Sequence, residues 1–137
     1  MRVRLNSVLV EDQEKALKFY TDVLGFVKKL DIPAAGARWI TLVPPDEPDE
    51  PDEPDGPELV LESAGFDFAK SYRKALYDSG IPFTALVSDD VQAEYEKLKA
   101  RGVAFKSAPS KIEGFPMMAT FDDTCGNYIM MFETGGR

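Results

Sequence analysis

Hydrophobic and polar residues alternate along the first segment of the chain and then change to helical spacing. The stretch "VRLNSVLV", residues 3–10, alternates as a β-strand does. Asp12 follows in the position of a helix N-cap, and apolar residues recur at helical spacing over residues 13–24. Gly25 is suited to end this helix. The pattern therefore predicts a strand, a capped helix and a turn. The expected apolar side of the helix carries Ala16, Leu17, Phe19, Tyr20 and Leu24.

Three more alternating segments follow and complete a first unit. They are "FVKKLDI", "RWITLVP" and "PELVLES". Each has the length and alternation of a strand, so the order from the N-terminus is βαβββ. Residues 67–78 then predict a second helix that ends at Gly80 and acts as a connector.

The same order of elements then occurs a second time. "PFTALVSDD" reads as a strand, Asp89 or Asp90 caps a helix over residues 91–101, and Gly102 ends it. Three strands follow, "VAFKSAP", "MMATFDD" and "NYIMMFE". The second unit is again βαβββ.

An alignment of the two units supports an internal duplication. When Asp12 is placed opposite Asp90, Leu5 falls opposite Phe83, and the two helix-ending glycines agree to within one residue. We expect one α+β domain built from two βαβββ modules. The domain spans residues 1–137. It consists of module one at about 1–64, a connector helix at about 66–80 and module two at about 81–134.

The net charge of −8 comes almost entirely from one loop. Residues 44–57 contain seven acids in "PPDEPDEPDEPDG", and the rest of the chain has 17 acids against 16 bases. Because the body is nearly neutral, no basic surface for nucleic acid is expected. Proline at every third position favours an extended, exposed loop between two strands.

The start of the chain and its single cysteine indicate a cytoplasmic protein. The residues after Met1 do not form the apolar run of a signal peptide, and Cys125 has no partner for an intrachain disulfide. No stretch has the roughly 18 apolar residues of a membrane span, so no membrane partner is expected.

Three segments carry a resemblance to a known family. "VEDQEKALKFYTDVLGF", "DDVQAEYEKLKARGV" and "FDDTCGNYIMMFE" resemble the glyoxalase, bleomycin-resistance and extradiol-dioxygenase superfamily, the vicinal oxygen chelate proteins. The resemblance implies that the sheets of the two modules form a curved, open cup around a small-molecule site. It also implies a homodimer, because relatives with this layout often pair.

In the metal-dependent enzymes of this superfamily, up to four ligands come from the first and last strands of each module. The resemblance places these positions at Leu5, Val60, Phe83 and Met130, all apolar, and the chain has no histidine. We therefore expect no metal and no cofactor. The register of the first strand stays open, because a slip of one residue would turn Asn6 inward instead of Leu5.

Few residues offer catalytic chemistry without imidazole. Glu58 and Glu62 share a strand face but lie about 13 Å apart along it, too far for a carboxylate pair. Cys125 lacks a histidine that could generate a thiolate. Of the neighbours Arg38 and Trp39, one faces the cup, as an anion clamp or an aromatic wall respectively.

These observations predict a metal-free protein that binds an apolar or aromatic small molecule in the cup, with no catalytic residue. The expected ligand-binding residues are Leu5, Ser7, Trp39, Val60, Phe83 and Met130. The alternative is an enzyme of the same superfamily that uses Glu58, Glu62 or a weakly held divalent cation. A partner module without a ligand is a third reading.

Overall fold

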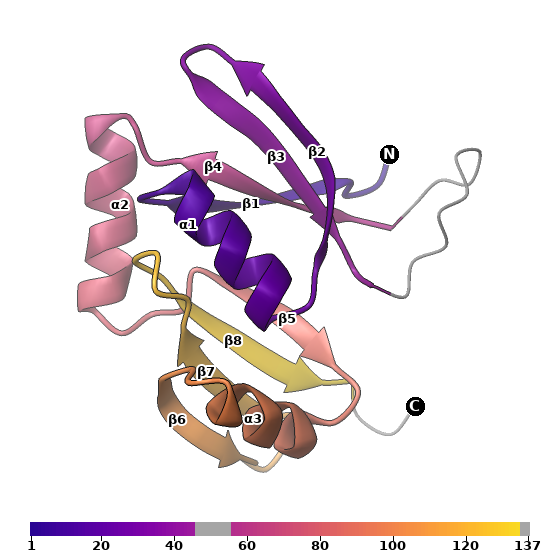
Figure 1. Cartoon of the computed structure of the whole chain (residues 1–137). Coiled ribbons are helices and arrows are strands. Elements are labelled where there is room, and N and C mark those ends of the chain that lie inside the picture. The colour runs from indigo at the N-terminus through magenta and orange to yellow at the C-terminus, as the bar shows by residue number, and fades with distance from the viewer. Residues whose placement is uncertain (46–55, 135–137) are drawn as a thin grey trace.

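The computed structural model describes residues 1–45 and 56–134 of the chain. Most of the expected acidic loop at 44–57 therefore lies outside the described residues. Eight strands and the helices between them appear in the order that the sequence predicts (Figure 1).

The first module has its predicted strands, but its helix changes character partway. Its elements are β1 (Leu5–Val10), α1 (Gln13–Lys18), η1 (Phe19–Val23), β2 (Val27–Ala34), β3 (Ala37–Val43) and β4 (Glu58–Ser63). The single helix predicted over 13–24 is thus an α-helix continued by a π-helical turn, in which the amide of Leu24 donates to the carbonyl of Phe19. The wider turn lets the adjacent side chains of Phe19 and Tyr20 both lie in the core.

The second module repeats this layout after the connecting helix. Its elements are α2 (Asp67–Asp78), β5 (Thr84–Ser88), α3 (Val91–Ala100), β6 (Phe105–Ser110), β7 (Met118–Asp122) and β8 (Tyr128–Glu133). Asp90, rather than Asp89, caps α3 by accepting from the amide of Ala93 at 2.9 Å, as Asp12 caps α1.

The two sheets have the same strand order, which is the structural signature of the duplication. The orders are β1-β4-β3-β2 and β5-β8-β7-β6, with a parallel pair formed by the first and last strand of each module. The side-chain Nδ2 of Asn6 on β1 donates to the side-chain hydroxyl of Thr84 on β5 at 2.9 Å, so equivalent positions of the two modules meet. The architecture is α+β with two open sheets.

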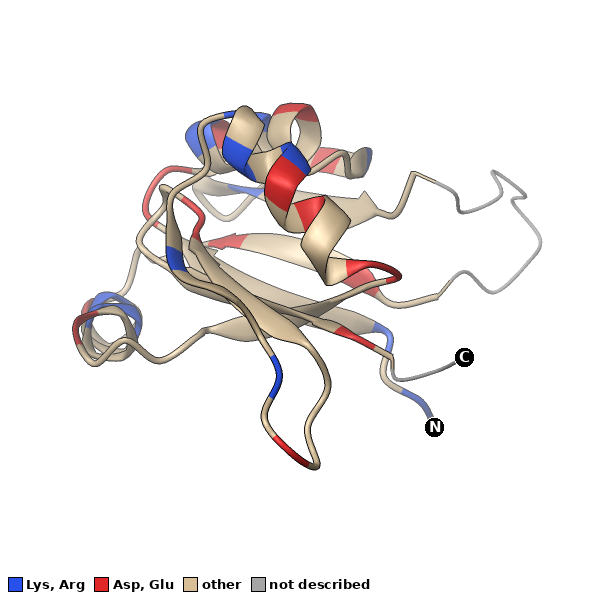
Figure 2. Ribbon diagram, turned by 90° about the horizontal axis from the view of Figure 1, so that it is seen from below, with Lys and Arg blue, Asp and Glu red and all other residues tan. Residues whose placement is uncertain are grey.

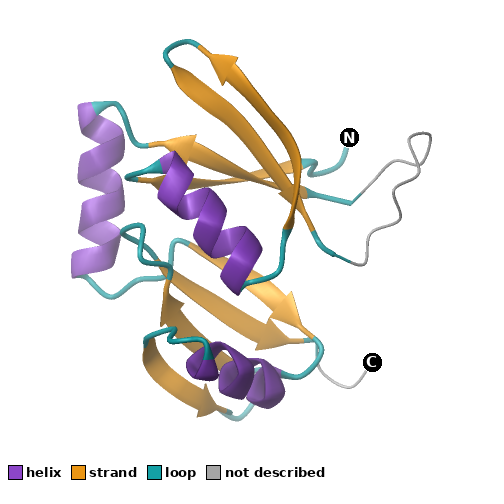
Figure 3. Cartoon of the chain, viewed as in Figure 1, coloured by secondary structure: helices purple, strands orange, loops and turns teal. Residues whose placement is uncertain are grey.

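One hydrophobic core is shared by the two modules. Val8 and Val10 of sheet one and Ala119 and Met131 of sheet two belong to the same buried cluster. The helices α1 and α3 lie over the same face of their respective sheets (Figure 3). Acidic and basic residues are intermixed on the helices (Figure 2). The opposite face of the two sheets, which these helices leave uncovered, is called the cup face below.

The helix α2 is attached near both sheets by side-chain contacts. Arg73 donates to the carboxylate of Glu11 at 2.7 Å and to the carbonyl of Gly126 at 2.5 Å. Near the end of the helix, the ring of Tyr77 stacks on Tyr128 with centroids 4.5 Å apart. Among the described residues, no helix is long and apolar enough to cross a membrane.

Candidate functional site

The burial pattern of β1 decides which residues face the cup. Val8 and Val10 are fully buried against the helices, so Leu5, Ser7 and Leu9 point to the cup face. The parallel pairing places Leu5 beside Glu58, Ser7 beside Val60 and Leu9 beside Glu62. Of the two registers left open by the sequence, the structure has the one with Leu5 inward. Asn6 lies on the other face.

The neighbours Arg38 and Trp39 of β3 lie on opposite faces of sheet one. The guanidinium of Arg38 lies on the helix side, where it donates to both carboxylate oxygens of Asp31, at 3.0 and 2.6 Å, and to Glu14. These hydrogen bonds lower the pKa of Asp31 and raise that of Arg38. Trp39 therefore lies on the cup face, where it is half-buried opposite Ile32 of β2.

The side chain of Gln13 fills a gap between β3 and β4. Its amide nitrogen donates to the carbonyls of Arg38 at 2.6 Å and Leu61 at 2.8 Å, and its oxygen accepts from the amide of Arg38. These strands run antiparallel from the pair Thr41 and Val60, so Trp39 lies toward the end of β4 that carries Glu62.

In the second module, Met130 of β8 lies on the cup face beside Ala85 and Thr120. Phe83 comes just before β5 and packs edge-on against Tyr72 of α2 with ring centroids 5.8 Å apart. The expected ligand-binding residues thus fall into two groups. Sheet one holds Leu5, Ser7, Trp39 and Val60, and module two holds Phe83 and Met130.

The two carboxylates of β4 are held in different ways. Glu58 is only 7% exposed and lies 3.5 Å from Arg4 and 3.6 Å from Lys29, so its charge is balanced within the protein. Glu62 accepts a hydrogen bond from the hydroxyl of Ser7 at 3.0 Å.

The donor set of the cup face does not fit the divalent metal of the superfamily's enzymes. The four positions implied by the resemblance carry Leu, Val, Phe and Met side chains, and none of them is a ligand for a hard or borderline cation. Within residues 1–45 and 56–134, no group of three or more acidic, cysteine or histidine side chains is placed to hold a metal ion. The side chains at these four positions therefore offer no ligands through which a divalent metal could act on a substrate.

Beside the carboxylate of Glu62 lies an open pocket of about 350 Å³ at the junction of sheet one and α2. It is lined by Leu9, Glu62, Ser63, Phe66, Phe68, Ala69 and Tyr72. The sequence pattern predicted α2 only as a connector, with no part for its aromatic residues in a binding site. The available signal was the phrase "GFDFAKSYR", in which Phe66, Phe68 and Tyr72 cluster around the start of this helix.

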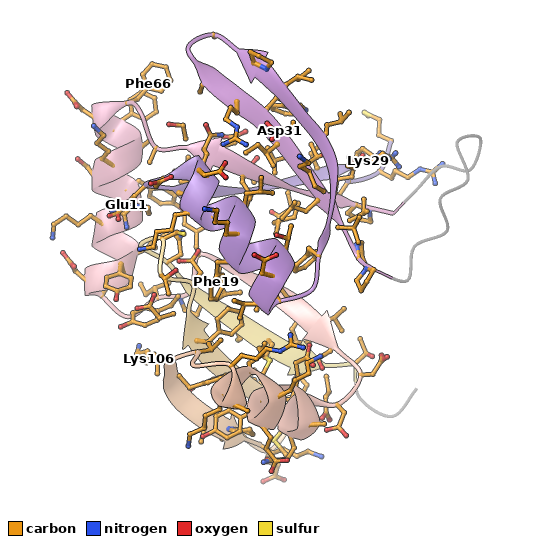
Figure 4. The ribbon with its side chains drawn as sticks, in the orientation of Figure 1. Glu11, Phe19, Lys29, Asp31, Phe66 and Lys106 are labelled. Carbon is orange, nitrogen blue, oxygen red and sulfur yellow. The ribbon has the colours of Figure 1, made fainter. Side chains whose placement is uncertain are left out.

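A second hollow, of about 310 Å³, lies on the other side of this junction. Its lining includes Glu11, Lys70, Arg73 and Lys74. Glu11 and Arg73 pair with each other there, and the position of Glu11 beside α2 is visible in Figure 4. The Glu11–Arg73 pair thus fastens α2 to the body, while Lys74 pairs with Asp78 within the helix.

A buried polar cluster lies under the turn before β8. Asp123 accepts from the hydroxyl of Tyr20 at 2.7 Å, from the amides of Cys125 and Asn127, and from the side chain of Asn127. Burial raises the pKa of Asp123 and of Tyr20. Burial and the nearby Asp123 raise the pKa of Cys125 to about 12, which suits a packed thiol rather than a nucleophile.

Comparisons with known proteins agree with this architecture. The family model described as Glyoxalase/Bleomycin resistance protein/Dioxygenase superfamily matches residues 4–131. The uncharacterized protein YurT of Bacillus subtilis (strain 168) is 44% identical over 133 residues, which span 97% of this chain and 99% of that protein.

Two similar solved structures extend the comparison. The crystal structure of UcmS2 is 30% identical with a TM-score of 0.77, over 96% of this chain and 97% of that one. TnmS3, an antibiotic binding protein from Streptomyces sp. CB03234, is 30% identical with a TM-score of 0.72, over 97% and 95% of the two chains. From its duplicated fold and the family match over nearly its whole length, this chain belongs to the glyoxalase, bleomycin-resistance and dioxygenase superfamily.

Proposed function

We propose that this protein captures an apolar or aromatic small molecule on its cup face, without a metal and without chemical turnover. The observation that carries the proposal is the composition of that face. The four positions that the resemblance aligns with metal ligands are apolar, and Leu5, Leu30 and Ile32 are exposed large apolar residues on the same side of sheet one. Exposed apolar area of this kind gains roughly 25 cal/mol per Å² when a ligand covers it.

The similarity to TnmS3 supports the same class of function, because that protein is an antibiotic binding protein with 30% identity to this chain. The pocket of about 350 Å³ lies beside Glu62, at the end of β4 toward which Trp39 of β3 lies. It has room for one ring system or chain of a larger ligand. The rest of such a ligand would lie along the open sheet.

The alternative of carboxylate catalysis has less support. Glu58 is enclosed by its own two cations, and the chain has no histidine to share a proton with Glu62. A general base also needs a convergent set of polar groups around the reacting atom, and the cup face around Glu62 is mainly apolar.

Pairing of two copies is part of the proposal. Leu5, Ile32 and Val87 remain exposed in the single chain, at 44%, 51% and 59%. A second copy that covers part of these residues would deepen the cups while leaving space for the ligand.

The test uses Trp39, the single tryptophan, as a reporter on the cup face. We expect planar aromatic compounds to change its fluorescence at concentrations where small hydroxy-acids have no effect. The variant Ile32→Asp places a charge opposite Trp39 and should weaken binding about tenfold or more, because an apolar ligand would have to cover and desolvate that carboxylate.

The matched control is Ile112→Asp, the same change at a residue that is 60% exposed in the loop after β6. It should bind like the unmodified protein. Equal affinity of the Ile32→Asp protein for the whole aromatic panel would contradict the proposed site.

A further inference from the structure

Three aromatic side chains stand out at the start of α2 because they are exposed rather than buried. Phe66, Phe68 and Tyr72 are 68%, 74% and 56% exposed. The rings of Phe66 and Phe68 stack almost parallel, with an interplanar angle of 7° and centroids 5.3 Å apart. Figure 4 shows Phe66 at the edge of the molecule, where α2 begins.

The position of these rings follows from how α2 is fixed. Ala69 is the buried residue of the first turn, so the helix rests on the body there. Phe68, next to it in the sequence, is turned outward, whereas one edge of Tyr72 packs on Phe83 and the rest of its ring stays exposed. Arg73, one turn further, is buried and holds the helix through Glu11. The rings therefore border a pocket whose position is fixed, because Ala69 and Arg73 hold α2 against the body.

Among the described residues that line this pocket, Glu62 is the one with a charged side chain. Ser7 donates to one of its oxygens at 3.0 Å and so fixes its direction. Across residues 1–45 and 56–134, no lysine or arginine is found in an ion pair with Glu62, whereas Glu58 on the same strand has both Arg4 and Lys29.

A carboxylate bordered by exposed aromatic faces is a receptor for a cation. The faces of phenyl rings carry negative electrostatic potential and attract ammonium groups, and the effect increases when the cation is partly desolvated. A carboxylate adds direct charge attraction and a hydrogen-bond acceptor. The same features disfavour an anion.

We infer that the ligand of this protein carries a protonated amine or quaternary ammonium group, seated against Phe66, Phe68 and Tyr72 with Glu62 as its counter-ion. The inference rests on the proposed function and narrows its ligand class from apolar or aromatic compounds to aromatic cations. The apolar body of the ligand lies on the cup face, and the pocket at α2 holds its charged end.

The experiment compares three probes with the same phenyl group and a chain of the same length, ending in an ammonium, a hydroxyl or a carboxylate. These are phenylpropylamine, phenylpropanol and phenylpropanoate, titrated at neutral pH and followed by Trp39 fluorescence and by calorimetry. We expect the amine to bind about fivefold or more tightly than the alcohol, and the carboxylate to bind most weakly.

Two variants separate the contributions. Glu62→Gln keeps an acceptor for Ser7 but removes the charge, and it should bring the amine and the alcohol to within about twofold of each other. Phe68→Leu keeps apolar area but removes the ring face, and it should reduce the preference for the amine more than it reduces alcohol binding. Glu96→Gln on α3 changes the net charge equally on the helix side of the sheets and should leave the preference unchanged.

The outcomes distinguish this inference from the function on which it rests. Equal binding of the amine and the alcohol by the unmodified protein would overturn the cation preference and leave small-molecule binding standing. No binding of any aromatic probe would overturn both. If the three rings instead form a contact between two copies, Phe66→Asp will lower the dimer fraction in sedimentation and the amine preference will be absent, which also overturns the inference.

Discussion

At the scale of single residues, Asp123 is one of the buried polar groups in the described part of the chain. Its carboxyl is fully buried and receives hydrogen bonds from a phenol, two backbone amides and a side-chain amide. Desolvation outweighs these bonds and raises its pKa above the ordinary value of 3.8. The cluster ties η1, through Tyr20, to the turn of the second module.

This shift predicts a pH dependence of stability. A carboxyl whose folded pKa is raised binds more protons in the folded state, so its contribution to the free energy of unfolding is present at acid pH and is lost as the pH rises through the folded pKa. We expect the unfolding free energy of the unmodified protein, measured relative to Asp123→Asn, to fall as the pH rises above about 4.

Urea unfolding at a series of pH values measures this difference. Asp89→Asn, an exposed change just before α3, serves as the control and should show no such trend. A difference that stays constant or grows with pH would contradict the assignment.

At the scale of elements, the attachment of α2 to the turn before β8 depends on one glycine. Gly126 has a positive φ of 91°, and a methyl group on it would overlap the guanidinium of Arg73. Arg73 in turn holds Glu11, which follows β1. Three segments far apart in the sequence therefore meet at this position.

Replacing Gly126 with alanine should cost more than backbone strain alone. Gly102 is the matched control, because its φ is 88° and nothing lies within 4 Å of an added methyl group. We expect Gly102→Ala to lower the free energy of unfolding by about 1–2 kcal/mol and Gly126→Ala to cost roughly 1–3 kcal/mol more, since it also displaces a buried hydrogen-bonded charge. Thermal and urea unfolding of the two variants measure the comparison. Equal losses would show that the Arg73 contact adds nothing.

The order of the elements was predictable because period-two and helical spacing are strong local signals in this chain. Asp12 was predicted as a cap, and the second cap was narrowed to Asp89 or Asp90, since capping depends on residues only three positions away. The π-helical turn after Lys18 was not predictable, because it depends on both Phe19 and Tyr20 finding space in a core formed by two modules. Local sequence does not contain that information.

The candidate site was predictable only where alternation along one strand decides it. Leu5 and Val60 share a face of sheet one, but the choice between Arg38 and Trp39 depended on the pairing of β3 with β4, in which Thr41 lies opposite Val60 and puts Trp39 on the same face. The aromatic pocket was missed because Glu62 and the rings of α2 come together through the placement of a whole helix.

At the scale of the whole molecule, the two modules form one cup but have different surroundings. The helix α2 packs against Phe83 and Tyr128 on the second module, while the equivalent region of the first module remains open around Leu5 and Ile32. The duplication thus gives two sheets with the same strand order. The connecting helix α2 makes their surroundings unequal, because it covers part of the second module. We expect ligand to prefer the open side.

The apolar cup also predicts how the purified protein responds to metals. We expect elemental analysis after mild purification to find no stoichiometric divalent cation, and added zinc, nickel or manganese to leave the melting temperature unchanged, because a cation that binds the folded state would raise it. Native mass spectrometry reports metal, retained ligand and the number of copies together. Near-equimolar metal that survives dialysis would contradict the alignment of Leu5, Val60, Phe83 and Met130 with the ligand positions.

The burial of Cys125 protects the folded protein from oxidation and alkylation at its thiol. Its thiol is the only one in the chain, is almost fully enclosed and has a pKa of about 12, so at neutral pH it is neither accessible nor ionised. Oxidants and alkylating agents act on thiolates that they can reach. They can attack this sulfur only after the turn before β8 has opened, so oxidation, or cross-linking of two chains through a disulfide, marks molecules that have already lost their native packing.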